Sequence, residues 1–533
     1  MKRMNILWIV ALALGGLFDL LFWKHTQGIN FAIYAFLCLS GGFLVLGLND
    51  IKPSWKSLLL LLPILFFATM TFIRQEPMSI FLAFAFTLGL MGLLASTYLG
   101  GGWLLYSLSD YVFNYAKLTG SMIVRPIIFW MGRKKQGGET SEPTVSASSS
   151  GWKRFWAVLR GVAIAIPILV IFAALLSSAD LVFAQRVQDF VKMFQLENLP
   201  EYIFRCIYIL VGAYALAGVF LHAAGKSQDE KRPGMEKPLV PPFLGFTEAT
   251  VVLGAVVVLF TLFAAVQFQY FFGGQTNIGV EGYTFSEYAR RGFGELVTVA
   301  FISMLLFLGL SAVVKRQNQV QRRIFSGLGL GMVVLVGVML FSAFQRLKLY
   351  EAAYGFSRLR AYTHIFMIWL GVLLAVVVVL DILRKERTFA LAALLASIGF
   401  AATLTLMNVD GFIVRQNVAR SEAGADLDVG YLASLSPDSV PALVNALQDG
   451  SLVPGTRNAV GAALACRIYT ERSSNVDTNW RGFTLSRWWA DRAMGKSDVK
   501  MILNNYGILD DDYPVQVQTP LGEKYDCSSY GMD

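Results

Sequence analysis

The sequence predicts an all-α protein: a polytopic bundle of about eleven transmembrane helices, followed by a small helical extracytoplasmic C-terminal domain. Hydrophobic residues make up 55% of the 533 residues and charged residues only 15%, which is more apolar surface than a soluble core absorbs. The apolar residues also gather in runs long enough to cross about 30 Å of hydrocarbon. Hydropathy falls after Met407, and this change predicts the separate C-terminal domain.

The first predicted span follows Lys2 and Arg3 and lacks an A-x-A-like cleavage site, so we expect a retained anchor. Residues 103–131 form a further apolar stretch, but polar residues interrupt it, which favours an interfacial or re-entrant helix. If that stretch crosses the membrane, every later orientation reverses. The predicted spans are 4–23, 29–48, 57–73, 78–99, 154–176, 202–224, 246–272, 288–314, 324–346, 359–383 and 388–407.

Lysine and arginine gather in alternate connections, which predicts a cytoplasmic N-terminus and an extracytoplasmic C-terminal domain in the cell membrane. From Asn408 onward, 11 basic and 16 acidic residues give a charge of 11 − 16 = −5. The net charge of the whole chain is +9, so the residues before Asn408 carry 9 + 5 = +14. Basic loops between spans are typical of contact with anionic inner-leaflet lipids, and we expect no nucleic-acid partner. The basic connections lie at 2–3, 52–56, 133–154, 226–237, 315–323 and 384–387.

The chain divides at a polar, low-complexity segment. Residues 133–152 are predicted to form a flexible cytoplasmic linker between an N-terminal four-helix membrane part with an interfacial helix (1–132) and a seven-helix core (153–407). In the soluble region (408–533), cap signals predict helices at 436–447, 457–471, 486–494 and 497–505. From Leu509 on we expect a loose acidic tail.

Cysteine and histidine are too scarce to indicate a metal site or a cofactor. The chain has four cysteines and three histidines, and no C-x-x-C, H-E-x-x-H or G-x-x-x-x-G-K-[ST] pattern. Cys466 and Cys527 lie outside the apolar runs in the region expected outside the membrane, where a disulfide between them would persist. The alternative is that Cys466 is a buried helix residue and Cys527 a free thiol.

Charged residues at the predicted outer helix ends form the candidate site. In the run Gly282 to Leu296, Glu287, Arg291 and Glu295 recur every four residues, so a helix there places them on one face. We expect them to pair with opposite charges near Tyr350 to Arg360 and near Asp180. Such a cluster can bind an anion, form a gate or join helices. Its candidate members are Asp180, Gln269, Glu287, Arg290, Arg291, Glu295, Arg346, Tyr350, Tyr354, Arg358 and Arg360.

Two further features stand within apolar runs. Glu248, near the inner end of its helix, is a candidate proton carrier of a transporter, or it caps the helix N-terminus after Gly245. Gly327 and Gly331 are spaced for close packing against another helix.

Six ordered motifs carry a resemblance. Over roughly Arg154 to Leu443 the chain resembles the bacterial multi-pass membrane family catalogued as domain of unknown function 4173, which is related to domain of unknown function 4153. The resemblance implies a bacterial envelope protein and no particular activity, and the N-terminal four helices lie largely outside it. The motifs are Ser178-Ala179-Asp180 with Phe183, Phe246 to Glu248, Gln269 to Gly274, Glu287 to Leu296, Tyr350 to Arg360, and Asn408 to Asp410 with Arg415 to Asn417.

Three classes of function remain open on these observations. In the first, an envelope structural, assembly or sensing protein, the charges join helices and the C-terminal domain holds a protein partner. In the second, a transporter, the outer cluster is a vestibule and Glu248 a coupling group. In the third, an enzyme acting on a lipid-linked substrate, Asp180, Glu287 or Glu295 is the acid or base. The balance is against an enzyme, and a water-filled cavity from the outer cluster toward Glu248 would favour transport.

Overall fold

The computed structural model describes residues 4–136, 199–227, 242–272, 293–383, 385, 388–473, 479–509 and 514–528, with isolated positions between 161 and 186. Two compact units are present. One comprises Met1–Leu20 and Thr119–His222, and the other comprises Leu21–Leu118 and Ala223–Asp533.

Among the described residues, ten helices are long and apolar enough to cross a membrane, so the chain is a multi-pass membrane protein. They correspond to ten of the eleven predicted spans, and the remaining one, 154–176, falls where the structure describes only isolated positions. The ten are α1 (Met4–Phe22), α2 (Ile29–Gly47), α3 with α4 (Trp55–Leu58, Leu61–Ile73), α5 (Pro77–Thr97), α9 (Leu199–Gly225), α10 (Phe246–Phe272), α12 (Phe293–Val313), α13 (Gln319–Tyr354), α14 (Arg358–Ile382) and α15 (Phe389–Met407).

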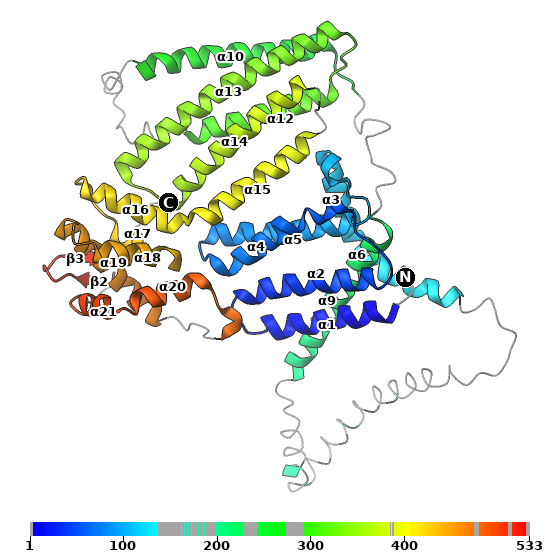
Figure 1. Ribbon diagram of the computed structural model, residues 1–533, viewed down its shortest axis with the longest axis horizontal. Coiled ribbons are helices and arrows are strands. Elements are labelled where there is room, and N and C mark those ends of the chain that lie inside the picture. Colours follow the sequence, from blue (N-terminus) through cyan, green and yellow to red (C-terminus); the bar gives the residue numbers. More distant parts are fainter. Residues whose placement is uncertain are drawn as a thin grey trace. The chain divides into compact units, whose positions relative to one another are not determined.

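In the larger unit the helices lie side by side in a row (Figure 1). The order is α10, α13, α14, α15, α5, α4 and α2, and α12 packs on α13. Stacked rings of Phe67 and Phe86, 5.0 Å apart, join α4 to α5, while Phe325 and Met332 of α13 are fully buried. Because α15 packs on α5, helices from before and after the predicted linker 133–152 belong to one unit. The compact units therefore differ from the predicted division into 1–132 and 153–407.

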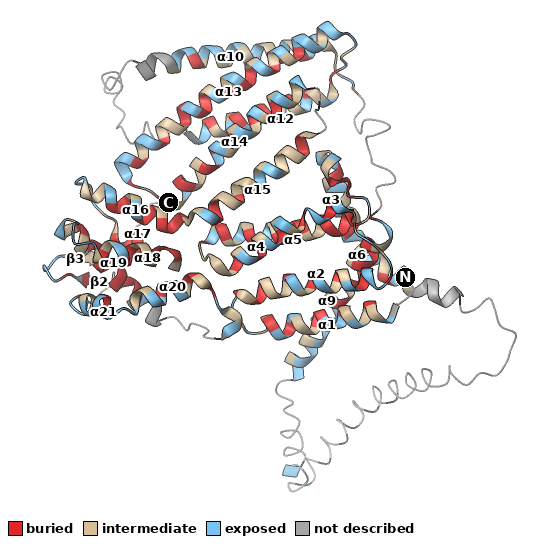
Figure 2. Ribbon diagram, in the orientation of Figure 1, coloured by how far each residue is buried: buried red, intermediate tan, exposed pale blue. Residues whose placement is uncertain are grey.

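Large apolar side chains cover the outer faces of the row, where Figure 2 shows intermediate and exposed positions. On α10, Val251, Val258 and Leu262 are 65%, 60% and 61% exposed. Such exposure is costly in water but suits a face that contacts lipid tails.

The helix α13 is longer than the predicted span 324–346. Asn318 and Gln321 form a capping box at its start, and Gly355, with φ of 79°, follows its last residue. Because α13 continues to Tyr354, Arg346, Tyr350 and Tyr354 all lie on this one helix.

The glycine of α13 that packs closely against another helix is Gly329, and not the predicted pair Gly327 and Gly331. An ideal Cβ on Gly329 would lie 2.1 Å from the Phe307 ring, whereas a Cβ on Gly327 or Gly331 would meet nothing within 4 Å.

The stretch predicted to be interfacial contains η1 (Gly102–Leu105) and the 29-residue helix α6 (Leu108–Gln136). Pro126 lies inside α6, and this helix is not among the ten apolar enough to span. Tyr115 on α6 donates a hydrogen bond of 2.7 Å to the carbonyl of Gly89 on α5. Within the smaller unit, Arg125 donates to the carbonyl of Leu221 on α9 at 3.0 Å.

The C-terminal region packs short helices around a buried central one. Val460, Leu464 and Cys466 of α19 are completely buried, and Figure 2 shows how buried positions concentrate in α17 to α19. The elements are α16 (Val409–Glu422), α17 (Val429–Ser434), η5 (Pro437–Ser439), α18 (Val440–Gln448), α19 (Pro454–Ser473), η6 (Trp480–Gly482), α20 (Leu485–Met494) and α21 (Ser497–Leu503). The four predicted helices are therefore present, with α16 and α17 in addition.

A small antiparallel sheet follows, in the order β1 (Gly507–Leu509), β2 (Gln516–Gln518) and β3 (Lys524–Asp526). Sequence patterns missed it, because three-residue strands are too short for an alternating pattern to register. Residues 514–528 are thus ordered on the domain and are not the loose tail that we expected from Leu509. Cys527, just after β3, forms a disulfide with Cys466 of α19.

Candidate functional site

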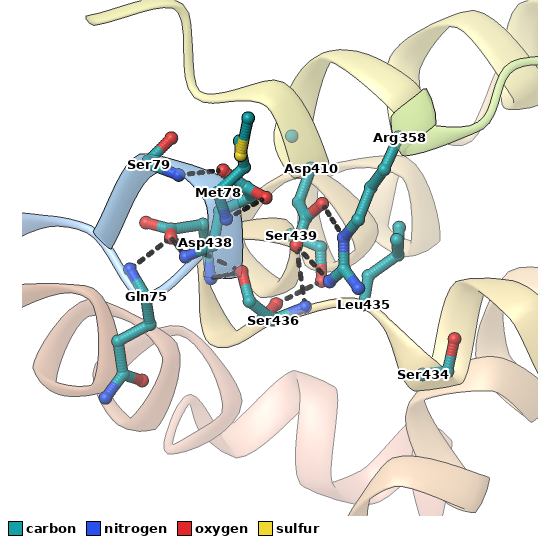
Figure 3. A network of polar contacts seen from close by, with 12 residues as sticks. Gln75, Met78, Ser79, Arg358, Asp410, Ser434, Leu435, Ser436, Asp438 and Ser439 are labelled. Atoms are coloured by element: carbon teal, nitrogen blue, oxygen red, sulfur yellow. Dashed lines mark hydrogen bonds and ion pairs between the residues drawn. The ribbon is translucent and has the colours of Figure 1, made fainter. Parts of the chain in front are cut away.

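Polar residues from three interhelical connections meet the segment Leu435–Ser439 at the junction between the row of helices and the C-terminal domain (Figure 3). The connections are those between α4 and α5, α13 and α14, and α15 and α16. We call this place the junction. Four groups of contacts build it.

The first is a buried ion pair. Arg358, the first residue of α14, donates to both carboxylate oxygens of Asp410 in α16, at 2.8 and 2.7 Å. Asp410 is completely buried and also accepts the Ser436 backbone N–H at 2.7 Å. The backbone N–H of Arg358 donates to the Tyr431 hydroxyl at 2.9 Å. A bidentate arginine–carboxylate contact of this kind fixes the orientation of the two side chains as well as their position.

The second group surrounds Asp438, whose carboxylate accepts the backbone N–H groups of Gln75 and Glu76 at 2.6 and 3.0 Å. Arg74 lies 3.4 Å from the other oxygen and donates to the carbonyl of Thr405 at 2.9 Å. Burial raises the pKa of the Asp438 carboxyl, although the Gln75 N–H and the charge of Arg74 partly oppose this. One side chain of the C-terminal domain thus holds the connection between α4 and α5.

The third group is the N-terminus of α5. The Glu76 carboxylate caps the helix by accepting from the backbone N–H groups of Met78 and Ser79, at 2.9 and 2.7 Å (Figure 3). It also accepts from the Tyr362 hydroxyl of α14. Pro77 occupies the first helical position, where its missing N–H costs nothing.

The fourth group holds the turn between α13 and α14. Asn417 of α16 accepts the Phe356 N–H at 2.7 Å and donates to its carbonyl at 2.9 Å. Arg420 donates to the carbonyls of Ala352 and Ala353, at 3.1 and 3.0 Å. Gly355 is required here because its φ is positive and a Cβ would lie 2.8 Å from both the Asn417 and Arg420 side chains.

Beside this turn lies a buried acid–imidazole pair. Glu351 of α13 and His364 of α14 are 2.8 Å apart, and Glu351 is 3% exposed. The second carboxylate oxygen of Glu351 and the Nδ1 atom of His364 have no protein partner among the described residues. Arg360 lies over the Tyr350 ring at 4.3 Å and donates to the carbonyl of Tyr354.

Three cavities flank the junction on the side of the C-terminal domain. One of about 590 Å³ lies between α16 and α18 and is lined by Arg415, Glu422 and Asn445 among others. A second, of about 390 Å³, is lined by Arg74 and Trp489 among others, and a third, of about 380 Å³, is lined by Arg360 and Asn417 among others. Within the described residues, no group of three or more His, Cys, Asp or Glu side chains is placed to hold a metal ion.

A family model described as a domain of unknown function, DUF4153, matches residues 61–446, which is well over half of the chain. The chain belongs to the DUF4153 family. No curated protein and no solved structure matches it. The sequence motifs indicated domain of unknown function 4173, with 4153 as its relative. The family model that matches is 4153, and 4173 is not shown.

The DUF4153 match begins at the start of α4, so our expectation that the N-terminal helices lie largely outside the family is wrong for α4 and α5. It ends within α18, and α19 to β3 follow it. All four groups of junction contacts lie inside the matched range.

The structure brings part of the predicted cluster to the junction. Tyr350, Tyr354, Arg358 and Arg360 surround the turn between α13 and α14. Arg346, one to two turns earlier on α13, donates at 2.6 Å to the side chain of Gln267 on α10.

Other predicted members lie elsewhere or outside the described part of the chain. Asp180 is exposed and accepts the N–H of Phe183 at 3.1 Å, and Glu295 is exposed in the first turn of α12. Glu248 accepts the Gly245 N–H at 2.8 Å, which is the capping role. Outside the description lie Glu287, Arg290, Arg291 and the side chain of Gln269, so the proposed pairing of Glu287, Arg291 and Glu295 stays a prediction.

The residues that carry most of the junction were missing from the sequence-based site. Two of them, Asp410 and Asn417, stood in motifs of the family resemblance, and that was the available signal. Arg74 lay outside the basic connections that set the predicted orientation, and Glu76 before Pro77 was an unused helix-cap signal. Their partners are far away in the sequence, so no local pattern joined them.

Proposed function

We propose that this DUF4153 protein is an envelope structural or assembly protein, in which the membrane helices hold the C-terminal domain in a fixed position for a protein partner. The carrying observation is that two buried carboxylates of the C-terminal region accept from donors of the membrane part. Asp410 accepts from the Arg358 guanidinium, and Asp438 accepts from the backbone N–H groups of Gln75 and Glu76. Breaking such a buried contact costs about 3–5 kcal/mol, so the domain is held rigidly.

Transport and catalysis are less well supported by this geometry. A carboxylate that binds a substrate or carries a proton must exchange its partners, and Asp410 would first lose two arginine contacts and a backbone N–H. Glu248, the proposed inner coupling group, lines none of the three junction cavities and is engaged in capping α10.

In the proposed orientation the N-terminus lies in the cytoplasm and the C-terminal domain lies outside. Alternating basic connections support this orientation. The disulfide between Cys466 and Cys527 supports it independently, because disulfides persist in oxidising compartments. The partner would then be a protein of the outer side of the membrane, and lipids would surround the helices.

The test separates docking of the domain from chemistry at the carboxylates. Glu76→Gln, Asp410→Asn and Glu351→Gln are compared with the control Glu248→Gln in a strain without its own copy. Limited proteolysis of the C-terminal domain reports docking, and resistance of the cells to detergent and osmotic shock reports function. We expect the resistance of the cells to detergent and osmotic shock to fall only in variants whose C-terminal domain becomes sensitive to protease. A variant with a docked, protease-resistant domain and lost function would overturn the proposal in favour of transport or catalysis.

A further inference from the structure

A cavity of about 770 Å³ lies between α12, α13 and α14, at the end of these helices where the connection 314–318 joins α12 to α13. Its wall within the helices is apolar and includes Phe307, Val333 and Val377. Its rim is basic and is formed by Lys315, Arg316, Arg322 and Arg323. It lies toward the start of α13 and the end of α14, whereas the junction is at the opposite ends of these helices, and it shares no lining residue with the three junction cavities.

Glycine spacing on α13 explains why the space exists. At Gly329 the helix packs directly on Phe307 of α12, because this residue has no side chain to hold the helices apart. Two residues earlier on α13, Gly327 is exposed and also lacks a side chain, and nothing lies within 4 Å of its Cβ position. The wall is therefore closed at Gly329 and open at Gly327.

The rim carries an excess of positive charge. Four basic side chains face one acidic lining residue, Asp381, which gives 4 − 1 = +3. Arg316 is positioned by the Ser311 carbonyl and hydroxyl, at 2.6 and 2.9 Å, and lies over the Phe325 ring at 4.7 Å. Among the described residues, Lys315, Arg322 and Arg323 form no salt bridge.

We propose that this cavity binds one anionic phospholipid, with its phosphate at the arginine rim and an acyl chain along the wall of Phe307, Val333 and Val377. The basic rim suits the phosphate headgroup of such a lipid, and the apolar wall between the helices suits its acyl chain. The charge rule places this rim at the cytoplasmic leaflet, where anionic lipids are found. The site is independent of the proposed role of the junction.

A soluble phosphate ester would present the same headgroup chemistry, so the experiment compares the two. Purified protein in neutral detergent is titrated with phosphatidylglycerol, with phosphatidylcholine of the same chains and with glycerol 3-phosphate, and binding is read by native mass spectrometry. Arg322→Gln with Arg323→Gln removes two rim charges. The matched control, Lys52→Gln with Lys385→Gln, removes two exposed charges from the same predicted side but outside the cavity.

A third variant, Gly327→Leu, adds an apolar side chain to the lining of the cavity without changing its charge. Leucine also favours the helix over glycine, and the position has room for a side chain, so the fold should persist, which thermal unfolding checks. We expect phosphatidylglycerol to bind in preference to phosphatidylcholine, with affinity about tenfold or more lower in the double arginine variant. We also expect weaker phosphatidylglycerol binding in Gly327→Leu and none of these changes in the control.

Three outcomes would overturn the lipid assignment. Equal losses in the arginine and lysine variants would indicate general attraction to a basic face. Equal binding of phosphatidylcholine would remove the role of the headgroup charge. Glycerol 3-phosphate binding as tightly as phosphatidylglycerol, and unaffected by Gly327→Leu, would assign the site to a soluble phosphate ester.

Discussion

Asp410 is the most constrained acid of the junction, since its fully buried carboxylate depends on Arg358 for its counter-charge. Replacing Arg358 with alanine leaves that charge buried and should lower the free energy of unfolding by about 3–5 kcal/mol. Asp410→Ala should cost a similar amount, and the double variant less than the sum of the two. Denaturant unfolding in detergent micelles measures all three. Additive losses would show that the two groups do not depend on each other.

Asp438 gives the junction a predictable pH dependence. Burial raises the pKa of its carboxyl above the ordinary value, so the native state binds this proton more tightly than the unfolded chain does. The resulting stabilisation is fully present below the unfolded-state pKa and is lost as pH rises through the folded-state pKa.

The measurement compares thermal unfolding of the native protein and of Asp438→Asn over roughly pH 3 to 8, from below the ordinary aspartate pKa to well above it. The asparagine amide does not titrate, so the variant should lack the loss of stability with rising pH that comes from Asp438. Its carbonyl oxygen can still accept the backbone N–H groups. A native protein whose stability rises with pH relative to the variant would show that the N–H groups and Arg74 outweigh burial.

At the scale of elements, the contact of α12 with α13 depends on Gly329. Alanine there must displace the Phe307 ring and should destabilise the protein by about 1–3 kcal/mol, despite a gain in helix propensity of about 1 kcal/mol. Gly331→Ala is the matched control, because its added methyl group meets nothing and should leave stability unchanged or raised. Thermal unfolding of the two variants compares them, and equal behaviour would contradict the tight contact.

The attachment of β3 to α19 depends on the disulfide, which links residues 61 apart in the sequence. By the loop-entropy estimate, Cys527→Ser should cost roughly 4 kcal/mol and loosen residues after β2 before it affects α19. Hydrogen exchange of the variant tests this order of loosening.

The same disulfide can be followed in cells. Cys206 is an exposed free cysteine, so it is first replaced by serine. In this Cys206→Ser background, unreduced protein should offer neither Cys466 nor Cys527 to an alkylating reagent. Alkylation of both without a reductant would contradict the oxidised state and weaken the case for an outer C-terminal domain.

For the whole molecule, the central prediction is topology. An alkaline phosphatase fused after Asn408 should be active, because that enzyme needs an oxidising outer compartment, while one fused within 134–151 should be inactive. The reverse pattern would invert the orientation. It would also move the proposed lipid site to the outer leaflet.

Composition, apolar run length and charge alternation were enough for the sequence to predict a multi-pass helix bundle, because crossing a lipid bilayer imposes a length and hydropathy that each helix must meet by itself. Ten of the predicted spans have counterparts among the described residues, and local cap signals located four helices of the C-terminal domain. Both properties are local, so they can be read without knowing the fold.

Only the tertiary structure decided which polar residues meet. Asp438 contacts the backbone of Gln75 across 363 positions in the sequence, and Tyr362 contacts Glu76 across 286. Likewise, packing chose Gly329 over Gly327 and Gly331 for the close contact on α13, and it placed the short strands on α19. The physical reason is that a buried charge is tolerated only where partners from several elements converge, and that convergence is a property of the packed chain.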